Sequence, residues 1–304
     1  MLLANIVLAA MNKPHCRLFE KGNENLNMKM IAVLLFSLLI SALSMAADTN
    51  PNSLRVALLP DEDAATLIKK HQRFKAHLAQ ALGRDVELLV TTDYSSMIEA
   101  MRHGRIDLGY FGPLSYVMAR SRSDIEAFAA KLNHGSPTYQ AVLIGNIAKG
   151  VNSFNDIKGG DVAYGDVAST SSHMIPKKML LDQKLKAGRD YRAHFLGAHD
   201  AVAMAVQRGH AVAGGLSKPI FETLIARGVI DLNKVRILAE SKHYPQYPWA
   251  MRSNLDAKLK SEIKAAFYQL TDPDILKAFK AEGLAPINDS DYDVVRELKA
   301  ALKL

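Results

Sequence analysis

Four consecutive hydroxyl residues, Ser169-Thr170-Ser171-Ser172, stand where an apolar strand pattern ends and a helical pattern begins. Side-chain hydroxyls and the first backbone N–H groups of a helix are hydrogen-bond donors, and the helix dipole adds partial positive charge there. Such a turn is suited to hold an oxyanion. A plain helix cap is the alternative, but a cap needs only one Ser or Thr. The pattern therefore favours an anion-binding turn.

Catalysis is a weaker interpretation of the same residues. Two serines of the turn, together with His199 and Asp200, supply the residue types of a nucleophilic triad. His199 and Asp200 are adjacent at a predicted helix start, however, so their side chains should diverge. No Gly-x-Ser-x-Gly segment surrounds the serines, and His173 and His199 lack the spacing of a zinc-binding helix. The sequence therefore predicts no enzyme, no metal site and no cofactor.

Short apolar strands and amphipathic helices alternate along the chain and would position this turn. A first set comprises strands at 54–59, 86–90 and 106–111 and helices at 67–82 and 97–102. A second set comprises strands at 139–147, 161–164, 193–196, 211–216 and 235–239 and helices at 172–184, 199–208 and 220–227. From Trp249 onward we expect helices only, at 255–270, 274–282 and 291–302. Alternation of this kind predicts an α/β fold with largely parallel sheets, and two sets predict two lobes with the ligand in the cleft between them.

The beginning of the chain has the features of an export signal. Lys29 precedes an apolar run at about 31–43 that ends in small residues. This arrangement is typical of a secretory signal peptide, and the run is shorter than the roughly 20 residues of a membrane span. An uncleaved anchor is the alternative. We expect residues 1–46, an upstream extension plus signal peptide, to be removed and the protein to reside in the periplasm. The translation start is left open between Met1, Met28 and Met30.

Composition narrows the class of protein further. Hydrophobic residues make up 49% of the chain, which indicates a globular protein. Its single cysteine, Cys16, lies in the segment expected to be removed, so the fold must be stable without disulfides. The formal net charge is +7, and residues 1–46 hold four Lys/Arg and two Glu, which leaves +5 on the rest of the chain. Such a mild positive field favours anionic ligands. The basic residues are scattered without interleaved aromatics, which argues against nucleic acid as a partner.

Five short segments follow one another along the chain: Thr92-Asp93-Tyr94, Asp107 to Tyr116, Ser136-Pro137-Thr138-Tyr139, Ser169-Thr170-Ser171 and Gly197-Ala198-His199-Asp200. In this order and spacing the chain resembles the substrate-binding proteins of phosphate/phosphite/phosphonate ABC transporters. The resemblance implies a type II-like clamshell, each lobe a mostly parallel sheet flanked by helices. It implies that 47–140 and 246–304 form lobe 1, and that 141–245 form lobe 2.

The resemblance also implies which residues bind ligand. Tyr94 and Tyr139 would approach it from the first lobe and the hinge, and His199 would donate to it from the second lobe. Three residues of the hydroxyl turn, Ser169, Thr170 and Ser171, would hold its oxygens. Neutral donors avoid the cost of burying a lysine or arginine beside the anion.

The function implied is that of the periplasmic binding component of an ABC importer. Its ligand would be a small phosphorus oxyanion, namely phosphite, phosphate or a small alkylphosphonate, and its protein partner a membrane permease. We expect a monomer. Two alternatives stay open: a subunit that presents its ligand to a sensor, and a binding protein for another oxyanion, such as a sulfonate or a thiamine-related phosphate.

The chain departs from the family where relatives hold the ammonium group of aminoalkylphosphonates with acidic residues. The corresponding positions are at Lys218-Pro219 and at Tyr247, and neither is acidic. An ammonium group in a dry cleft without a carboxylate is costly, so aminoethylphosphonate should bind poorly. We expect Tyr247 to line the pocket for the ligand's tail and to occupy part of it. Glu222 is a weaker candidate for a compensating acid.

Overall fold

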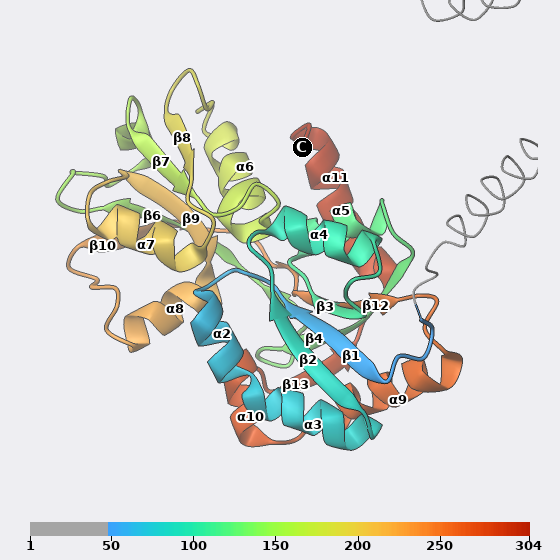
Figure 1. The fold of residues 1–304 in the computed structure, drawn as a ribbon. Helices are drawn as coiled ribbons and strands as arrows, with labels where there is room; N and C mark the ends of the chain where they lie inside the picture. The colour runs from blue at the N-terminus through green and yellow to red at the C-terminus, as the bar shows by residue number, and fades with distance from the viewer. Residues whose placement is uncertain (1–47) are drawn as a thin grey trace, which may run out of the picture. The chain divides into compact units, whose positions relative to one another are not determined.

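The computed structural model describes residues 48–304, which form two large sheets with their covering helices and one two-stranded sheet (Figure 1). The predicted extension and signal peptide lie outside the described residues. The α/β class is confirmed. No helix within 48–304 is both long and apolar enough to cross a membrane. We call the six-stranded sheet and its helices the first lobe, and the five-stranded sheet and its helices the second.

The first lobe has a sheet with the order β13-β4-β12-β3-β1-β2. Its strands are β1 (Ser53–Leu58), β2 (Asp85–Val90), β3 (Leu108–Tyr110), β4 (Ile125–Leu132), β12 (Pro248–Arg252) and β13 (Gly283–Pro286). Its helices are α2 (Ala64–Lys70), α3 (Gln72–Leu82), α4 (Tyr94–Arg102), α5 (Pro113–Arg120), α9 (Ala257–Tyr268), α10 (Pro273–Phe279) and α11 (Asp293–Ala301), with a short 3-10 turn at Asp289–Tyr292.

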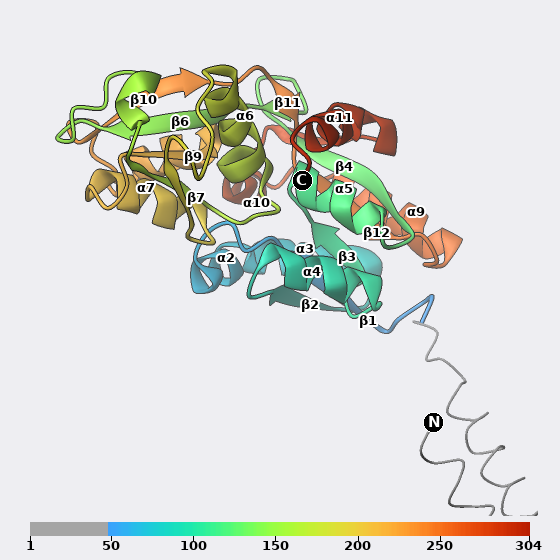
Figure 2. The ribbon, with the colours of Figure 1, turned by 90° about the horizontal axis from the view of Figure 1, so that it is seen from above.

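The second lobe has a sheet with the order β10-β6-β9-β7-β8. Its strands are β6 (Ala141–Asn146), β7 (Asp161–Tyr164), β8 (Arg192–Phe195), β9 (Ala213–Ser217) and β10 (Val235–Glu240). Its helices are α6 (Ile175–Asp182), α7 (His199–Gln207) and α8 (Lys218–Ala226), with a 3-10 turn at Phe154–Ile157 and a π-helical turn at Thr170–Met174. Figure 2 shows this sheet and its helices from a second direction.

Both sheets follow one plan, and it corrects the prediction of mostly parallel sheets. In the first lobe β1 pairs parallel with β2 and β3, and in the second β7 pairs parallel with β8 and β9. The strand that arrives from the opposite lobe, β12 or β6, is inserted antiparallel beside this trio. The sheets are therefore mixed, because a strand that enters from the other lobe must run against the strands it joins.

The structure also contains elements that the sequence patterns did not predict. These are α5, β4, β12 and β13, and the two late strands overturn the expectation of helices only after Trp249. All five residues of β12 are buried, so it lacks the alternation of polar and apolar residues that marks a half-exposed strand. The helix expected at 172–184 is instead the π-helical turn followed by α6.

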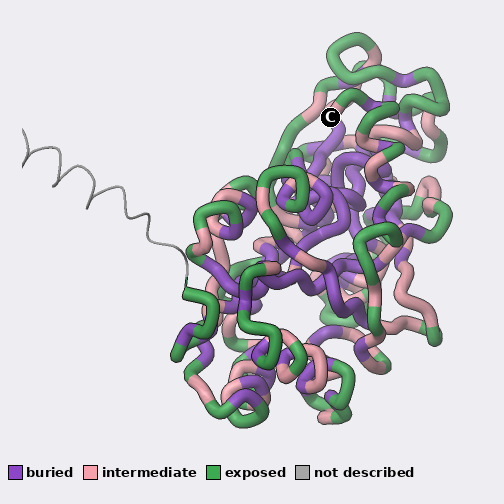
Figure 3. The backbone as a smooth tube through the Cα atoms, turned by 90° about the vertical axis from the view of Figure 1, so that its right-hand side faces the viewer, coloured by how far each residue is buried: buried purple, intermediate pink, exposed green. Residues whose placement is uncertain are grey.

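Alternate residues of the central strands face different cores. Leu54, Val56 and Leu58 of β1 pack with α3, α9 and α10, whereas Ala57 packs with α4, α5 and α11. In β6, Val142 and Ile144 pack with α7 and α8, while Leu143 packs toward α6. This is the period of two that a strand imposes. Figure 3 shows the result as a buried interior beneath exposed outer turns.

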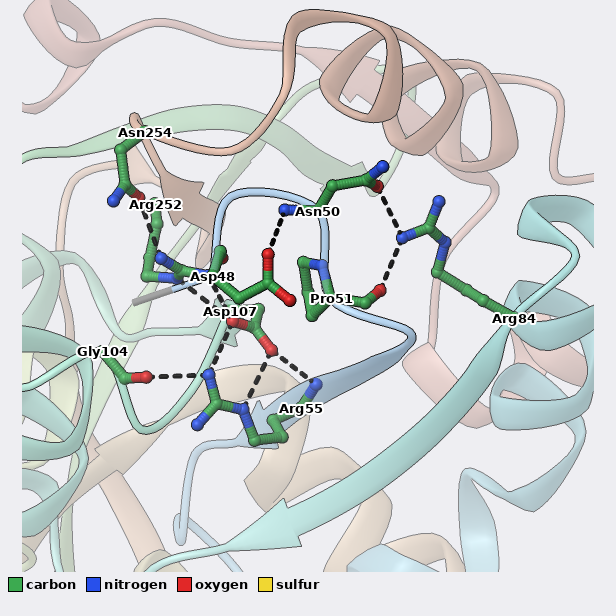
Figure 4. A network of polar contacts seen from close by, with 9 residues as sticks. All are labelled: Asp48, Asn50, Pro51, Arg55, Arg84, Gly104, Asp107, Arg252 and Asn254. Carbon is green, nitrogen blue, oxygen red and sulfur yellow. Dashed lines mark hydrogen bonds and ion pairs between the residues drawn. The ribbon is translucent and has the colours of Figure 1, made fainter. Parts of the chain in front are cut away.

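A buried ion cluster fixes the first lobe (Figure 4). Asp107, which is fully buried, accepts hydrogen bonds from the guanidinium groups of Arg55 at 2.8 and 3.1 Å and of Arg252 at 2.7 and 3.1 Å. It also accepts one from the backbone N–H of Arg55 at 2.9 Å. The carboxylate joins β1 and β12 just before β3, so this residue of the Asp107 to Tyr116 segment is structural.

The chain crosses between the lobes twice, and the crossings lie side by side. The short strand β5 (Thr138–Tyr139) pairs antiparallel with β11 (Tyr244–Pro245), with Tyr139 opposite Tyr244. Tyr139 of the predicted site therefore sits in the connection itself. The lobe boundaries at 140 and 246 stay predictions.

Candidate oxyanion site between the lobes

Each lobe has three strands that run parallel to one another, and the loops after all six strands lie in the same region of the molecule. Asp61 follows β1, Tyr94 follows β2, and Leu114 follows β3. In the second lobe the hydroxyl turn follows β7, His199 follows β8, and Ser217 ends β9. The carboxyl ends of parallel strands are where α/β sheets bind ligands. The fold therefore brings loops from both lobes to one place.

Three helix N-termini meet in this region. Tyr94 is the first residue of α4, Thr170 the first of the π-helical turn, and His199 the first of α7. The first N–H groups of a helix have no partner within the helix, and the dipole makes that end partly positive. The backbone alone thus favours negative charge between the lobes.

The hydroxyl turn does cap a helix, but some of its hydroxyl groups can still donate a hydrogen bond. Ser169 Oγ accepts a hydrogen bond from Ser172 N at 3.1 Å, and Thr170 Oγ1 accepts one from Leu114 N at 2.7 Å. A hydroxyl that accepts a bond still has its own proton to donate. Ser171 Oγ is buried and has no hydrogen-bond partner within the described residues. Ser172 differs, because its hydroxyl bonds to Gly165 N and Gly215 O and serves the fold.

The two predicted tyrosines place their hydroxyls beside this turn. Tyr94 is 1% exposed and Tyr139 is 3% exposed, and neither phenol oxygen has a hydrogen-bond partner within residues 48–304. Burial raises the pKa of Tyr94, and the nearby Ser169 hydroxyl opposes this shift. Burial likewise raises the pKa of Tyr139, opposed by Ser171 and Thr170. The hydroxyls thus approach one another without meeting in hydrogen-bond geometry.

The structure defines the tautomer of His199. Its ring is fully buried, and Nδ1 accepts a hydrogen bond from the backbone N–H of Ser217 at 3.0 Å. A nitrogen that accepts from an N–H carries no proton, so the neutral ring must carry its proton on Nε2. Burial lowers the pKa of His199 to about 4, which keeps the ring neutral near pH 7. Nε2 has no partner in the described chain and is a neutral donor.

Tyr247 lies between the hydroxyl turn and a small cavity. Its ring packs edge-on against that of Tyr139, with the ring centroids 5.3 Å apart. Burial is the main cause that raises the pKa of Tyr247; the neighbouring tyrosines add to the rise, and the Ser171 hydroxyl opposes it. Tyr247 also lines a cavity of about 40 Å³ together with Asp61, Gln246 and Ser217. Such a volume accommodates only a few atoms. Glu222 does not line this cavity; it lies in a separate, larger groove beside Lys218.

Charged residues at this cavity were not predicted from the sequence. Asp61 and Glu62 lie on the segment after β1, and both are buried. Glu62 Oε1 lies 3.6 Å from Lys70 Nζ and 3.8 Å from Lys280 Nζ. Lys131 is buried and donates to the carbonyl of Phe279 at 3.1 Å. The only sequence sign of this group was an acidic run directly after a strand.

Contacts close the cleft in this structure. His199 N donates to Asp61 O at 3.0 Å, Leu114 N donates to Thr170 Oγ1 at 2.7 Å, and Tyr94 N donates to Asp166 Oδ2 at 3.3 Å. Each bond links an element of one lobe to an element of the other. All six predicted ligand-binding residues and Tyr247 are thereby buried at or beside this junction.

The arrangement does not support nucleophilic catalysis. The carboxylate of Asp200 accepts from Ala201 N at 2.8 Å, and His199 Nδ1 is bonded to Ser217 N, so the two side chains do not form a relay. Among residues 48–304 no three His, Cys, Asp or Glu side chains are grouped as metal ligands. What the region offers is a set of neutral hydrogen-bond donors.

Comparison with known proteins identifies the family. Residues 56–292 match the family described as ABC transporter, phosphonate, periplasmic substrate-binding protein. The chain belongs to this family. Its members bind substrates for ABC transporters and are not enzymes, which confirms the interpretation against catalysis. Among relatives of this phosphonate-binding family, the phosphate-import protein PhnD of Mycolicibacterium smegmatis is 25% identical over 283 residues, covering 84% of this chain and 87% of the relative.

A second relative supports the same family and provides a structural comparison. The probable ABC transporter phosphite-binding protein PhnD1 of Prochlorococcus marinus is 25% identical over 279 residues, covering 86% of this chain and 94% of the relative. The structure of PhnD1 in complex with methylphosphonate superposes with a TM-score of 0.78 at 23% identity, covering 84% of this chain and 99% of that one. The two-lobed binding-protein fold is thus confirmed.

Proposed function

We propose that this protein is the periplasmic binding component of an ABC importer and captures a small phosphorus oxyanion between its lobes. The ligand class is phosphite, phosphate or a small alkylphosphonate. One named relative is a phosphate-import protein, the other is a probable phosphite-binding protein, and the compared structure holds methylphosphonate. We further propose that the protein acts as a monomer and delivers its ligand to a membrane permease.

One observation carries this proposal: buried donors without partners converge from both lobes. Tyr94, Tyr139, Ser171 and His199 each have a buried polar atom without a partner in the described chain. A buried polar group without a partner costs about 1–3 kcal/mol. A tetrahedral anion would satisfy these groups together, through charge-assisted bonds worth about 1.5–3 kcal/mol each.

The site favours an anion without burying a cation against it. Within residues 48–304, its unpartnered side-chain donors are hydroxyls and one neutral imidazole. The lysines line the adjoining cavity instead. Because the cavity holds only a few atoms, the ligand should carry a hydrogen, a hydroxyl or a short substituent on phosphorus.

Calorimetric titration tests the proposal with phosphite, phosphate, methylphosphonate, aminoethylphosphonate and sulfate. We expect micromolar or tighter binding of at least one of the first three. His199→Asn and Tyr94→Phe should weaken it about 10-fold or more, because each removes a donor to a charged group. Tyr164→Phe is the matched control, since its buried hydroxyl is bonded to that of Tyr191 at 2.8 Å, away from the site.

The titration also has outcomes that overturn the proposal. Failure of all three small phosphorus anions to bind would remove the phosphorus assignment. Tight binding of sulfate, without binding of phosphite or phosphate, would show that the ligand class is sulfur oxyanions instead.

A further inference from the structure

Asp61 is a buried carboxyl group without a partner. Its exposed fraction is 8%, and within residues 48–304 its carboxylate makes no hydrogen bond and no ion pair within 4.0 Å. Its backbone carbonyl accepts the bond from His199 N that joins the lobes. Asp61 is therefore held at the junction itself, and its side chain lines the small cavity with Tyr247.

Its charge reaches the proposed oxyanion site. After burial, the Asp61 charge is the next cause that raises the pKa of Tyr94, and it adds to the rise for Tyr139 and Tyr247. These hydroxyls come from three different elements around the cleft. A carboxylate that acts on all of them would face any anion bound among them.

Other charged and titratable groups surround Asp61, and the charged ones among them have partners of their own. They come from every neighbouring element: Glu62 beside it, Lys70 and His71 at the end of α2, Lys131 on β4, Lys280 after α10, His199 on α7, and the tyrosines 94, 110, 139 and 247. Glu62 lies closest to Lys70 and Lys280, and Lys131 donates to a carbonyl. Asp61 is the acid that they leave unpaired.

The protonation of Asp61 is finely balanced. Burial raises its pKa to about 7, the charge of Glu62 adds to the rise, and the lysines 280, 70 and 131 oppose it. An anion placed nearby would raise that pKa further, because a neighbouring like charge disfavours the ionised form.

We propose that Asp61 determines specificity by sharing one proton with the bound oxyanion. This inference rests on the proposed function. The proton is carried either by a ligand P–OH group, which then donates to the Asp61 carboxylate, or by Asp61, which then donates to a ligand oxygen. Either arrangement turns repulsion between two negative groups into a hydrogen bond.

The shared proton explains how a site of neutral donors can distinguish tetrahedral anions. Phosphorus oxyanions titrate near neutral pH, as phosphate monoesters do with a second pKa of about 6. Sulfate carries no proton near neutral pH, so its binding requires that Asp61 itself be protonated. Phosphite, phosphate and methylphosphonate should therefore bind more tightly than sulfate at pH 7–8, and the advantage should narrow at lower pH.

Proton uptake on binding tests this inference directly. The purified protein is titrated with methylphosphonate at pH 6–9 in two buffers of different ionisation enthalpy, and then with sulfate. Above pH 8 the wild type should take up about one proton per ligand, and its affinity should fall about tenfold per pH unit. Asp61→Asn should bind with little proton uptake and should keep its affinity at high pH. Glu62→Gln is the matched control, because Glu62 is buried beside Asp61 but paired with lysines.

The outcomes separate this inference from the function it rests on. Tight binding of methylphosphonate by the wild type without proton uptake above pH 8 would overturn the role of Asp61 and leave the proposed function intact. Full proton uptake by Asp61→Asn would do the same. Failure of methylphosphonate, phosphate and phosphite to bind the wild type would overturn both.

Discussion

Replacing Ser171 by alanine should weaken ligand binding without weakening the fold. Its hydroxyl is buried and bonds to nothing within the described chain, so its removal relieves a desolvation cost in the ligand-free protein. The free energy of unfolding should stay constant or rise by up to about 1 kcal/mol. Loss of a bond to a charged ligand costs about 1.5–3 kcal/mol, which corresponds to roughly 10- to 150-fold in Kd.

The next residue in the chain supplies the control. Ser172 is equally buried, but its hydroxyl bonds to Gly165 N and Gly215 O. Ser172→Ala leaves these backbone groups without that partner and should lower the free energy of unfolding by about 1–3 kcal/mol. Urea unfolding of the ligand-free variants, together with calorimetric titration of the tightest phosphorus anion, measures both effects. If Ser171→Ala lost as much stability as Ser172→Ala and kept wild-type affinity, Ser171 would be a structural residue.

Three further predictions concern the buried charges. Asp107→Ala should lower the free energy of unfolding by about 3–5 kcal/mol in urea, since it leaves two arginines without their shared carboxylate; wild-type stability would contradict this. His199 and His71, with pKa lowered by burial to about 4 and about 3, hold fewer protons folded than unfolded. Stability should therefore be complete above about pH 6.5 and decline toward pH 4, less steeply in His199→Asn, as thermal unfolding across that range would show. Asp61 has the opposite sign: with its folded pKa raised to about 7, its contribution is complete below about pH 4 and lost as pH rises through 7. Asp61→Asn should thus raise the melting temperature most at pH 8–9, and an equal rise at pH 4 would refute the assignment.

The hydroxyl turn could be predicted from the sequence because its parts are neighbours in the chain. A strand end, four hydroxyl residues and a helix start lie within one short segment, and the structure keeps that order. The roles expected for Tyr94 and His199 came from the family resemblance, and the structure places each at the start of a helix that follows a strand. Their proximity follows from a general property of α/β folds: carboxyl ends of parallel strands share an edge.

The sequence could not predict features that arise only when distant segments meet. Asp61 is buried by residues from β4, α10 and the segment before β12, so its unpaired state has no local pattern. The tautomer of His199 depends on the backbone N–H of Ser217, which lies on another strand. The strand β12 was missed for a related reason: neighbours bury it on both sides, which removes its alternation.

The most direct test of the account is a crystal structure of the protein with the tightest phosphorus anion from the titration. We predict a tetrahedral density between the lobes, with its oxygens about 3 Å from Ser171 Oγ, His199 Nε2 and the hydroxyls of Tyr94 and Tyr139. A ligand oxygen, and not the substituent on phosphorus, should lie within hydrogen-bond distance of the Asp61 carboxyl group. Density in the groove beside Lys218 and Glu222, with these four donors still unbonded, would contradict the account.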